Sequence, residues 1–382
     1  MSVRSDYFKL EKSIFDRYLT NLKESKDTLF VLDKKYFYCP SIEILNLIIS
    51  LNKKMNEIDL LFNTFSYFAK GQILQSLLID EIEATNKIEN IQSTRHDIFY
   101  LLNHESIVSK DKRIKFISNA YKNLLQEKGK PVLTLHDLRE LYDVVLKDAI
   151  NKEERPDGEY FRKGDVFVSD GIKPIHYGVN GEENINRFML EFLNVYNSNI
   201  EVFTKLILSH FIFENVHPFY DGNGRFGRFL FTKELFKETD SICSFLISTA
   251  FETAKSKYYK AFKLADDRYQ FGCLNEYLRI VAEILNDYFE KTLNTLKGNI
   301  DRLKKLMIPS DLTKSENKIY KLIAESTIYS TYGVSNEEIK KETNVSKRTL
   351  IYSLNRFKSL DMIEDTKIGK TTYHKIKEEY MK

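Results

Sequence analysis

The sequence gathers several chemically active residue types in the short stretch 217–228, which reads HPFYDGNGRFGR. Gly222 and Gly224 flank Asn223, and these residue types tolerate positive φ. Their successive backbone N–H groups can therefore converge into an anion-binding nest. A helix is expected from Arg225 to about Glu238, so its positive N-terminal end would face the same anion.

Charged side chains make this stretch suitable for a polyphosphate. Arg225 and Arg228 are three residues apart, so they project from one face of the expected helix, where their guanidiniums can hold phosphate oxygens. Asp221 places a carboxylate beside those phosphates, which is how proteins usually bind Mg²⁺. His217 has an ordinary pKa suited to a general base near neutral pH. Phe219 is expected to anchor the loop in the core.

The same residues could be explained one at a time by a turn with a capping aspartate and two surface arginines. That explanation fits any single residue better than it fits the whole set. A Walker A loop is excluded, because the Gly-Lys-Ser/Thr end is absent.

The elements that position this stretch are mostly helical. Apolar residues recur at helical spacing over 41–66, 70–89, 135–148, 183–197, 200–214, 225–238, 251–265 and 271–305. Residues 155–177 differ, because short apolar runs flank an Asp170–Gly171 dipeptide there, which predicts a β-hairpin. Pro309–Ser310 is the expected linker to a further module.

Composition predicts a soluble, cytoplasmic protein of two or three domains. The chain has 382 residues, of which 42% are hydrophobic and 30% charged, and a net charge of +3, too small to indicate nucleic-acid binding by the whole chain. The cysteines Cys39, Cys243 and Cys273 show neither metal-ligand spacing nor a disulfide framework. We expect no membrane contact, because the start lacks a signal peptide's apolar core and no apolar run could span a bilayer.

Residues 217–228 resemble the Fic motif, His-Pro-Phe-x-(Asp/Glu)-Gly-Asn-Gly-Arg-x-x-Arg, at every defined position. The similarity extends to Gly158–Tyr177, which resembles the family's substrate-clamping flap, and to Ser248–Leu285, which resembles its closing helices. Residues from about 40 to 290 are covered. The resemblance implies a mainly α fold, with a Fic-type helical core and one β-hairpin flap.

The resemblance also implies a reaction, the transfer of AMP from ATP to a Ser, Thr or Tyr hydroxyl of a protein, either a partner or the chain itself. His217 would deprotonate the hydroxyl, and Asp221 would hold a Mg²⁺ ion that bridges the α- and β-phosphates. The resemblance implies phosphate contacts for the other residues. Gly222, Asn223 and Gly224 would bind through the nest and the Asn223 side chain, Arg225 would neutralise charge on the β-phosphate, and Arg228 would hold the γ-phosphate.

A second segment, residues 85–90 (TNKIEN), resembles the family's inhibitory motif, (Ser/Thr)-x-x-x-Glu-(Gly/Asn). Thr85 and Glu89 are four residues apart and share one face of the expected helix. A solvated helix end would explain this pair by itself. The resemblance instead implies that Glu89 pairs with Arg228 and occupies the guanidinium that the γ-phosphate needs, so we expect a self-inhibited enzyme.

Residues 315–376 predict three helices and a hairpin, a pattern that resembles a small C-terminal winged helix-turn-helix domain. The third helix carries only basic charges, at Lys347, Arg348, Arg356 and Lys358. The module is expected either to contact DNA or to serve protein interaction, including a homodimer. The expected regions are an N-terminal helical region with the inhibitory helix over 1–110, a Fic catalytic core over 111–305 and the winged module over 310–382.

Other functions stay open at this stage. The chain could be a DNA-binding regulator in which the Fic core senses a ligand. It could also use another donor, such as UTP or a phosphocholine nucleotide, or remove AMP. The two intact arginines favour triphosphate chemistry, but the base is not specified by the motif. Tyr258–Tyr259 could stack on adenine or simply pack, and His210 is expected to be a core histidine.

Overall fold

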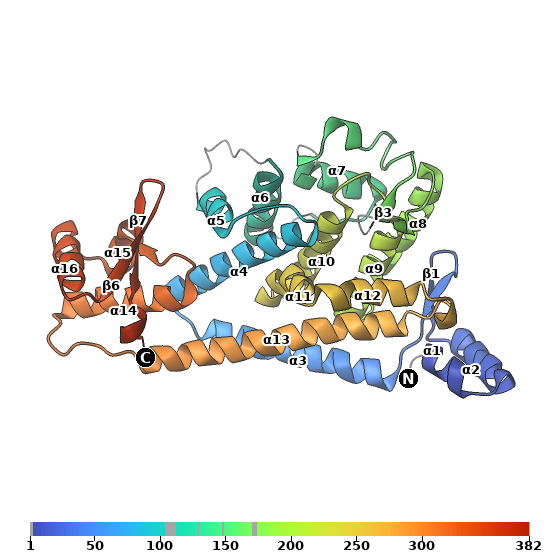
Figure 1. Cartoon of the computed structure of the whole chain (residues 1–382), viewed down its shortest axis with the longest axis horizontal. Helices are drawn as coiled ribbons and strands as arrows, with labels where there is room; N and C mark the ends of the chain where they lie inside the picture. Colours follow the sequence, from blue (N-terminus) through green and yellow to red (C-terminus); the bar gives the residue numbers. More distant parts are fainter. Residues whose placement is uncertain (1–2, 104–111, 128–129, 147–148, 170–173, 382) are drawn as a thin grey trace. The chain divides into compact units, whose positions relative to one another are not determined.

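The computed structural model describes residues 3–103, 112–127, 130–146, 149–169 and 174–381, which are mainly α-helical as predicted (Figure 1). The chain divides into two compact units. The first consists of Met1–Asn56 and Asp80–Phe289, and the second of Glu57–Ile79 and Glu290–Lys382. The stretch 217–228 and the segment 85–90 both belong to the first unit.

The first unit begins with two helices and a hairpin that the sequence did not predict. Helices α1 (Val3–Lys9) and α2 (Lys12–Glu24) precede the antiparallel strands β1 (Leu29–Val31) and β2 (Tyr36–Tyr38). The turn residues Leu32, Asp33 and Lys34 all have positive φ. None of them is glycine or asparagine, so the usual sign of a tight turn is missing from the sequence.

Three long helices have residues in both units. They are α3 (Ile42–Asn63), α4 (Tyr67–Ile88) and α13 (Asn275–Lys304), which confirm the helices expected over 41–66, 70–89 and 271–305. Helix α4 ends just before Asn90, whose φ of 57° is left-handed. Asparagine adopts this conformation more readily than most residues, which explains why the helix stops there.

The core of the first unit is built around two almost fully buried helices, α9 (Val202–Val216) and α10 (Asn223–Thr239), which lie side by side. Helix α9 is apolar on nearly every face, as expected of a helix at the centre of a core. The surrounding helices are α5 (Arg95–Asn103), α6 (Lys112–Glu127), α7 (Leu135–Leu146), α8 (Glu182–Tyr196), α11 (Ile247–Thr253) and α12 (Lys255–Ala265). Short 3₁₀ helices span Lys152–Glu154, Ile242–Leu246 and Arg268–Gln270.

The hairpin expected in residues 155–177 is present as strands β3 (Phe167–Ser169) and β4 (Pro174–Tyr177). The strands are antiparallel, with Phe167 opposite Tyr177 and a register shift after Val168. The Asp170–Gly171 dipeptide that predicted its turn lies outside the described residues.

In the second unit, residues after 310 form the elements expected there, with one added short strand. Helices α14 (Lys314–Tyr329), α15 (Asn336–Thr343) and α16 (Lys347–Ser359) accompany β5 (Val334–Ser335), β6 (Ile363–Ile368) and β7 (Thr371–Ile376), and a 3₁₀ helix follows at Glu378–Tyr380. The strands form a sheet in the order β5-β7-β6. Thr313 and Ser335 begin α14 and α15 with capping boxes, and the Ser346 side chain caps α16.

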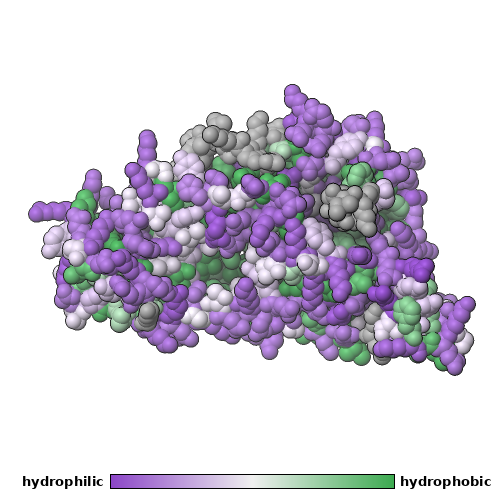
Figure 2. All heavy atoms as spheres, viewed as in Figure 1, coloured by the Kyte–Doolittle hydropathy of each residue, from purple (hydrophilic) through white to green (hydrophobic). Residues whose placement is uncertain are grey.

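The face of the molecule drawn in Figure 2 is mostly hydrophilic, and hydrophobic side chains appear on it only in scattered patches. Among the described residues, none of the helices combines the length and the apolar character needed to cross a bilayer.

Candidate active site

His217 lies where α9 ends and the chain turns into the loop of residues 218–222. It caps α9 in a left-handed conformation, with φ 54° and ψ 61°, and its N–H donates to the Phe213 carbonyl. Its ring Nδ1 lies 3.3 Å from the carbonyl oxygen of Glu214. Because a carbonyl only accepts, Nδ1 carries the hydrogen in this contact and Nε2 keeps its lone pair. Burial lowers the pKa of His217 to about 4, so the ring is neutral near pH 7.

The loop after His217 is held in place by an aromatic stack and by an asparagine. Phe219 is fully buried, which confirms its predicted anchoring, and its ring stacks on Tyr142 with centroids 3.6 Å apart. The side chain of Asn223 bonds to the Phe219 backbone at both ends, at 2.9 Å and 2.7 Å. Asn223 therefore shapes the loop. The Tyr142 hydroxyl donates to the Asp221 carbonyl at 3.0 Å, which ties the loop to α7.

The expected nest coincides with the start of α10, which begins at Asn223, two residues earlier than predicted. Gly222 caps the helix with a φ of 79°. A Cβ atom there would also meet the Leu146 side chain. The glycine thus permits both the left-handed turn and the close approach of α7. The N-terminal N–H groups of α10 are presented at this turn, as an anion site requires.

Arg225 is buried and incompletely bonded. Its terminal NH2 group donates to Asp221 at 3.2 Å, whereas its Nε and NH1 atoms have no hydrogen-bond partner among the described residues. A buried guanidinium N–H without an acceptor is costly.

Arg228 is bound by the end of α4, a segment far away in the sequence. Its Nε donates to the Thr85 hydroxyl at 3.0 Å, and its NH2 group donates to the Thr85 carbonyl at 3.1 Å and to Glu89 Oε1 at 2.8 Å. The Arg228 side chain is only 1% exposed, whereas that of Glu89 is 34% exposed. The two segments singled out in the sequence therefore meet at one guanidinium.

The electrostatics of this contact favour an ionised pair. Burial alone would raise the pKa of Glu89, but the charge and the hydrogen bond of Arg228 lower it below its ordinary value. Gly224 makes room for the carboxylate, because a Cβ atom at that position would collide with Glu89 Oε1. The Glu89 carboxylate thus lies directly against the start of α10.

Arg162 positions the backbone of His217, and the sequence analysis did not identify it. Its guanidinium is fully buried and donates to the His217 carbonyl at 2.9 Å, the Gly164 carbonyl at 2.6 Å and the Val179 carbonyl at 2.8 Å. It lies in the segment before β3, where the sequence YFRKGD shows an ordinary charged pattern. Only the fold reveals that this arginine faces inward.

A cavity opens between the nest and the helices that follow it. It is lined by Glu89, His176, Glu214, His217, Gly224, Arg228, Tyr258, Tyr259 and Phe262. His176 Nε2 lies 2.8 Å from the Asn215 carbonyl, which connects β4 to the end of α9. Burial raises the pKa of Glu214 to about 8.

The two tyrosines of α12 differ in their surroundings. Tyr258 is buried and packs against Phe251, with ring centroids 4.5 Å apart. Its hydroxyl lies 2.8 Å from His210 Nε2, and His210 is a buried core histidine as predicted. Both tyrosines line the cavity, and Tyr259 is the more exposed of the two.

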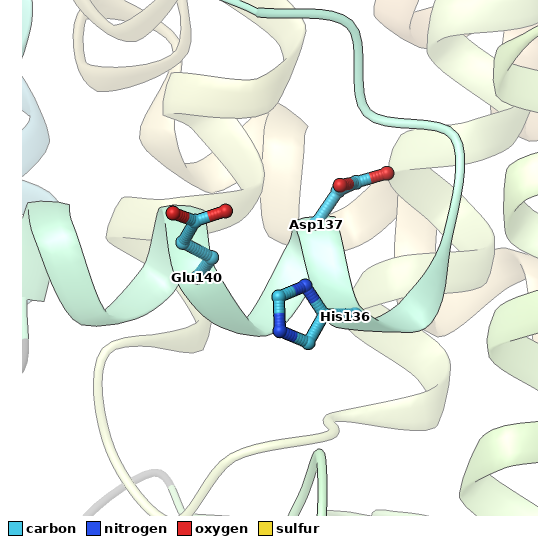
Figure 3. A group of neighbouring side chains, drawn as sticks. All are labelled: His136, Asp137 and Glu140. Carbon is cyan, nitrogen blue, oxygen red and sulfur yellow. The ribbon is translucent and has the colours of Figure 1, made fainter.

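A second polar group on α7 lies outside this arrangement. His136, Asp137 and Glu140 lie close together on the first turns of the helix (Figure 3). Asp137 Oδ2 accepts hydrogen bonds from the Thr134 hydroxyl and from the N–H groups of Leu133 and Thr134. These bonds explain Asp137 as part of the helix start, so the group carries no metal assignment.

Comparison with known proteins finds similarity to the central part of the chain. Residues 132–235 match the sequence model of the Fic/DOC family. The protein adenylyltransferase Fic of Drosophila willistoni is 27% identical over 192 residues, which covers 50% of this chain and 33% of that protein. The corresponding protein of Drosophila melanogaster is 28% identical over 195 residues, covering 50% of this chain and 34% of the relative. The chain thus spans about a third of the length of these curated relatives.

One solved structure shows that the fold is shared. A Fic family protein from Desulfovibrio desulfuricans G20 superposes with a TM-score of 0.56 at 17% sequence identity. The match covers 89% of this chain and 98% of that chain.

Proposed function

Because residues 132–235 match the sequence model of the Fic/DOC family, we propose that this chain is a self-inhibited enzyme that transfers AMP from ATP to a protein hydroxyl. The proposal is carried by the geometry of His217. Its Nδ1 atom is engaged by the Glu214 carbonyl, which leaves Nε2 to act as a base beside the nest. The acceptor is a Ser, Thr or Tyr side chain, on another protein or on the chain itself.

The reaction is a displacement at the α-phosphorus of ATP. His217 Nε2 takes the proton of the target hydroxyl, and the hydroxyl oxygen forms a bond to the α-phosphorus. The bond from that phosphorus to the oxygen that bridges to the β-phosphate breaks, and pyrophosphate leaves with the bonding electrons. His217 then releases its proton to solvent. A general base of this kind contributes roughly 10²- to 10⁴-fold.

The phosphates would be held by the nest and by the two arginines. The N–H groups at Gly222–Gly224 and the N-terminus of α10 would bind the α- and β-phosphates. Arg225 would give its buried, unpartnered Nε and NH1 groups to the β-phosphate. Arg228 would hold the γ-phosphate through charge-assisted hydrogen bonds. Catalysis by these groups is positioning and charge neutralisation.

Asp221 suits the Mg²⁺ ion that the family implies. Its carboxylate is 44% exposed beside the nest, and its Oδ1 and Oδ2 atoms are held by the Gly222 N–H and by Arg225. Such a carboxylate keeps lone pairs for a hard cation. When bound, Mg²⁺ would neutralise phosphate charge as pyrophosphate leaves.

Inhibition would follow from competition for Arg228. The guanidinium binds Glu89 in this structure, and the same N–H group is the one proposed for the γ-phosphate. A γ-phosphate placed there would meet the negative charge of Glu89 at close range. The proposal therefore includes low activity of the unaltered chain.

Intact-mass measurement of the Glu89→Gly protein with Mg²⁺ and each nucleoside triphosphate in turn tests the proposal. We expect a mass gain equal to one AMP with ATP, on the chain itself or on a target protein. A gain equal to another nucleotide would assign another donor, and loss of AMP from a modified protein would indicate the reverse reaction. No mass change with any donor would refute the proposed transfer.

For residues 310–382 we propose a winged helix-turn-helix module that contacts DNA weakly. The order of elements from α14 to β7 supports it, and Lys347 and Arg348 are exposed at the start of α16. Arg356, which the sequence analysis grouped with them, donates instead to Glu316 at 2.8 Å and to Asp311 at 2.5 Å. The proposed DNA contact is therefore limited to the N-terminal end of α16.

A further inference from the structure

A carboxylate is buried on α4 two turns before Glu89. Glu81 is 0% exposed, and it shares one face of the helix with Thr85 and Glu89, because residues four apart lie above one another. Thr85 and Glu89 both contact Arg228. Glu81 does not line the cavity beside His217, so the proposed reaction gives it no part.

Glu81 binds the beginning of α11. The N–H group of Ser248 lies 2.9 Å and 2.8 Å from its two carboxylate oxygens, and the N–H group of Thr249 lies 3.2 Å from Oε2. Its Oε1 atom also accepts from the Thr232 hydroxyl of α10 at 3.3 Å and from the Tyr121 hydroxyl of α6 at 3.4 Å. The first free N–H groups of a helix favour an anion. Glu81 therefore attaches α4 to three other helices at one point.

The contact is reciprocal, because α12 caps the other end of α4. Lys255 Nζ donates to the Ile88 carbonyl at 2.9 Å and to the Lys87 carbonyl at 3.4 Å. A cation at the C-terminal carbonyls of a helix is stabilising. Lys87 in turn pairs with Glu252 of α11 at 2.5 Å. Thus α4 supplies carboxyl oxygens as acceptors to the start of α11, and the first residue of α12 supplies a cation to the end of α4.

We propose that Glu81 and Lys255 are positioning residues for the contact between Glu89 and Arg228. They prevent α4 from sliding along its axis and from rotating about it, so that Glu89 reaches the guanidinium. Glu89 follows the last residue of α4 and is partly exposed, so its place depends on where the helix is held. A helix transmits displacement rigidly: a slip of one residue moves it about 1.5 Å and turns it by about 100°. Either change would take the carboxylate off the guanidinium. This inference rests on the proposed function.

The test combines matched substitutions in two backgrounds. Glu81→Gln replaces one acceptor oxygen with an amide NH2 group and keeps the shape, and Lys255→Gln removes the charged cap from a partly exposed position. Glu83→Gln is the control, because it makes the same change on the same helix, but at a partly exposed side chain near Arg95. Each is measured for AMP transfer from α-labelled ATP in the full chain, with Glu89 present and with Glu89→Gly.

With Glu89 present, we expect Glu81→Gln and Lys255→Gln to raise transfer by about three- to tenfold, since hydrogen bonds that hold α4 are weakened in each variant. In the Glu89→Gly background, both should change transfer by less than about twofold, because residues that act through one contact are not additive. Glu83→Gln should have no effect in either background. No gain with Glu89 present, or an equal loss in both backgrounds, would overturn the proposal.

Hydrogen exchange separates this inference from the proposed function. The amides of residues 82–90 should exchange faster in Glu81→Gln and Lys255→Gln than in Glu83→Gln, whatever the enzyme does with ATP. If Glu89→Gly gains no activity, the proposed inhibition by Glu89 is refuted. If the amides of residues 82–90 exchange at an unchanged rate in Glu81→Gln and Lys255→Gln, the positioning role is refuted, whatever the activity. If Glu81→Gln does not fold, Lys255→Gln decides, and an unaltered activity and exchange in that variant would refute the proposal.

Discussion

The NH2 group of Arg228 donates to Glu89 Oε1 at 2.8 Å, although 139 residues separate the two in the chain. The Nε atom of the same guanidinium donates a second hydrogen bond, to the Thr85 hydroxyl. One buried cation therefore binds both Thr85 and Glu89. Since the same guanidinium is proposed for the γ-phosphate, Arg228 would serve two competing anions.

Glu89→Gly should raise transfer of AMP by about ten- to a hundredfold, because a charge-assisted hydrogen bond is worth ~1.5–3 kcal/mol. Arg228→Ala should abolish that gain, since it removes both the inhibitory contact and the grip on the nucleotide. Label transfer from α-labelled ATP measures both, with Glu89→Gln as a control that removes the charge and keeps the volume. A double variant as active as Glu89→Gly would show that the two residues share no phosphate-binding role.

His217→Ala, in the Glu89→Gly background, should lower transfer by roughly 10²- to 10⁴-fold while leaving ATP binding nearly unchanged. The imidazole lies beside the nest, and the nest itself is made of backbone N–H groups at the start of α10. Calorimetric titration with ATP gives the affinity, and a transfer assay gives the rate. Transfer at the rate of Glu89→Gly alone would remove His217 from the mechanism.

Transfer by Glu89→Gly should be insensitive to the ionisation of His217 between about pH 6 and pH 8. Burial lowers the pKa of this histidine to about 4, and a base must be deprotonated to act, so the active form is present above that value and is lost as the pH falls through it. A profile of kcat/KM against pH tests this. A fall in kcat/KM as the pH is lowered through about 6.5, the ordinary pKa of histidine, would contradict the assignment of His217 as the base.

The sequence predicted the parts of the site that are local in the chain. The nest, both arginines and His217 lie within residues 217–228, so their relation follows from spacing and from the start of a helix. The Asn223 side chain, for which the resemblance implies a phosphate contact, is bonded to the Phe219 backbone through both its Oδ1 and Nδ2 atoms. The contact of Glu89 with Arg228 was implied only by the family resemblance, because no local pattern connects segments so far apart.

Charged residues that the fold buries could not be predicted from the sequence. Glu81 and Arg162 are charged, and a charged residue in a single sequence is expected at the surface. Both are buried because several hydrogen bonds satisfy them, which only the fold brings together. The hairpin β1–β2 was missed for a related reason, since its turn uses Leu32, Asp33 and Lys34 at positive φ.

The full chain should bind duplex DNA weakly, and the double variant Lys347→Ala, Arg348→Ala should lose that binding. Phosphate contacts release counterions, so affinity should fall steeply as salt is raised. Arg356→Ala is the control, because Arg356 is paired with Glu316 and Asp311. Fluorescence anisotropy with a labelled duplex over a salt series measures both effects. Binding that is absent at low salt, or independent of salt, would favour a protein-interaction module.

Arg162→Lys should lower the turnover of Glu89→Gly by about tenfold and leave the affinity for ATP nearly unchanged. Arg162 donates to four carbonyls, those of His217, Gly164, Val179 and Val216, and a lysine ammonium cannot reproduce this planar arrangement. The buried carbonyls left without donors should also reduce the free energy of unfolding by about 2–4 kcal/mol.

Arg187→Lys supplies the matched control, because Arg187 is an exposed arginine of α8 whose partner is Asp33 at the surface. It should change neither the rate nor the stability by more than about 0.5 kcal/mol. Transfer kinetics and urea unfolding of the two variants in parallel separate the effects. If Arg162→Lys unfolds at a lower urea concentration but transfers AMP at the full rate, Arg162 stabilises the segment before β3 without positioning His217. If it weakens ATP binding as much as turnover, Arg162 acts on the nest rather than on the base.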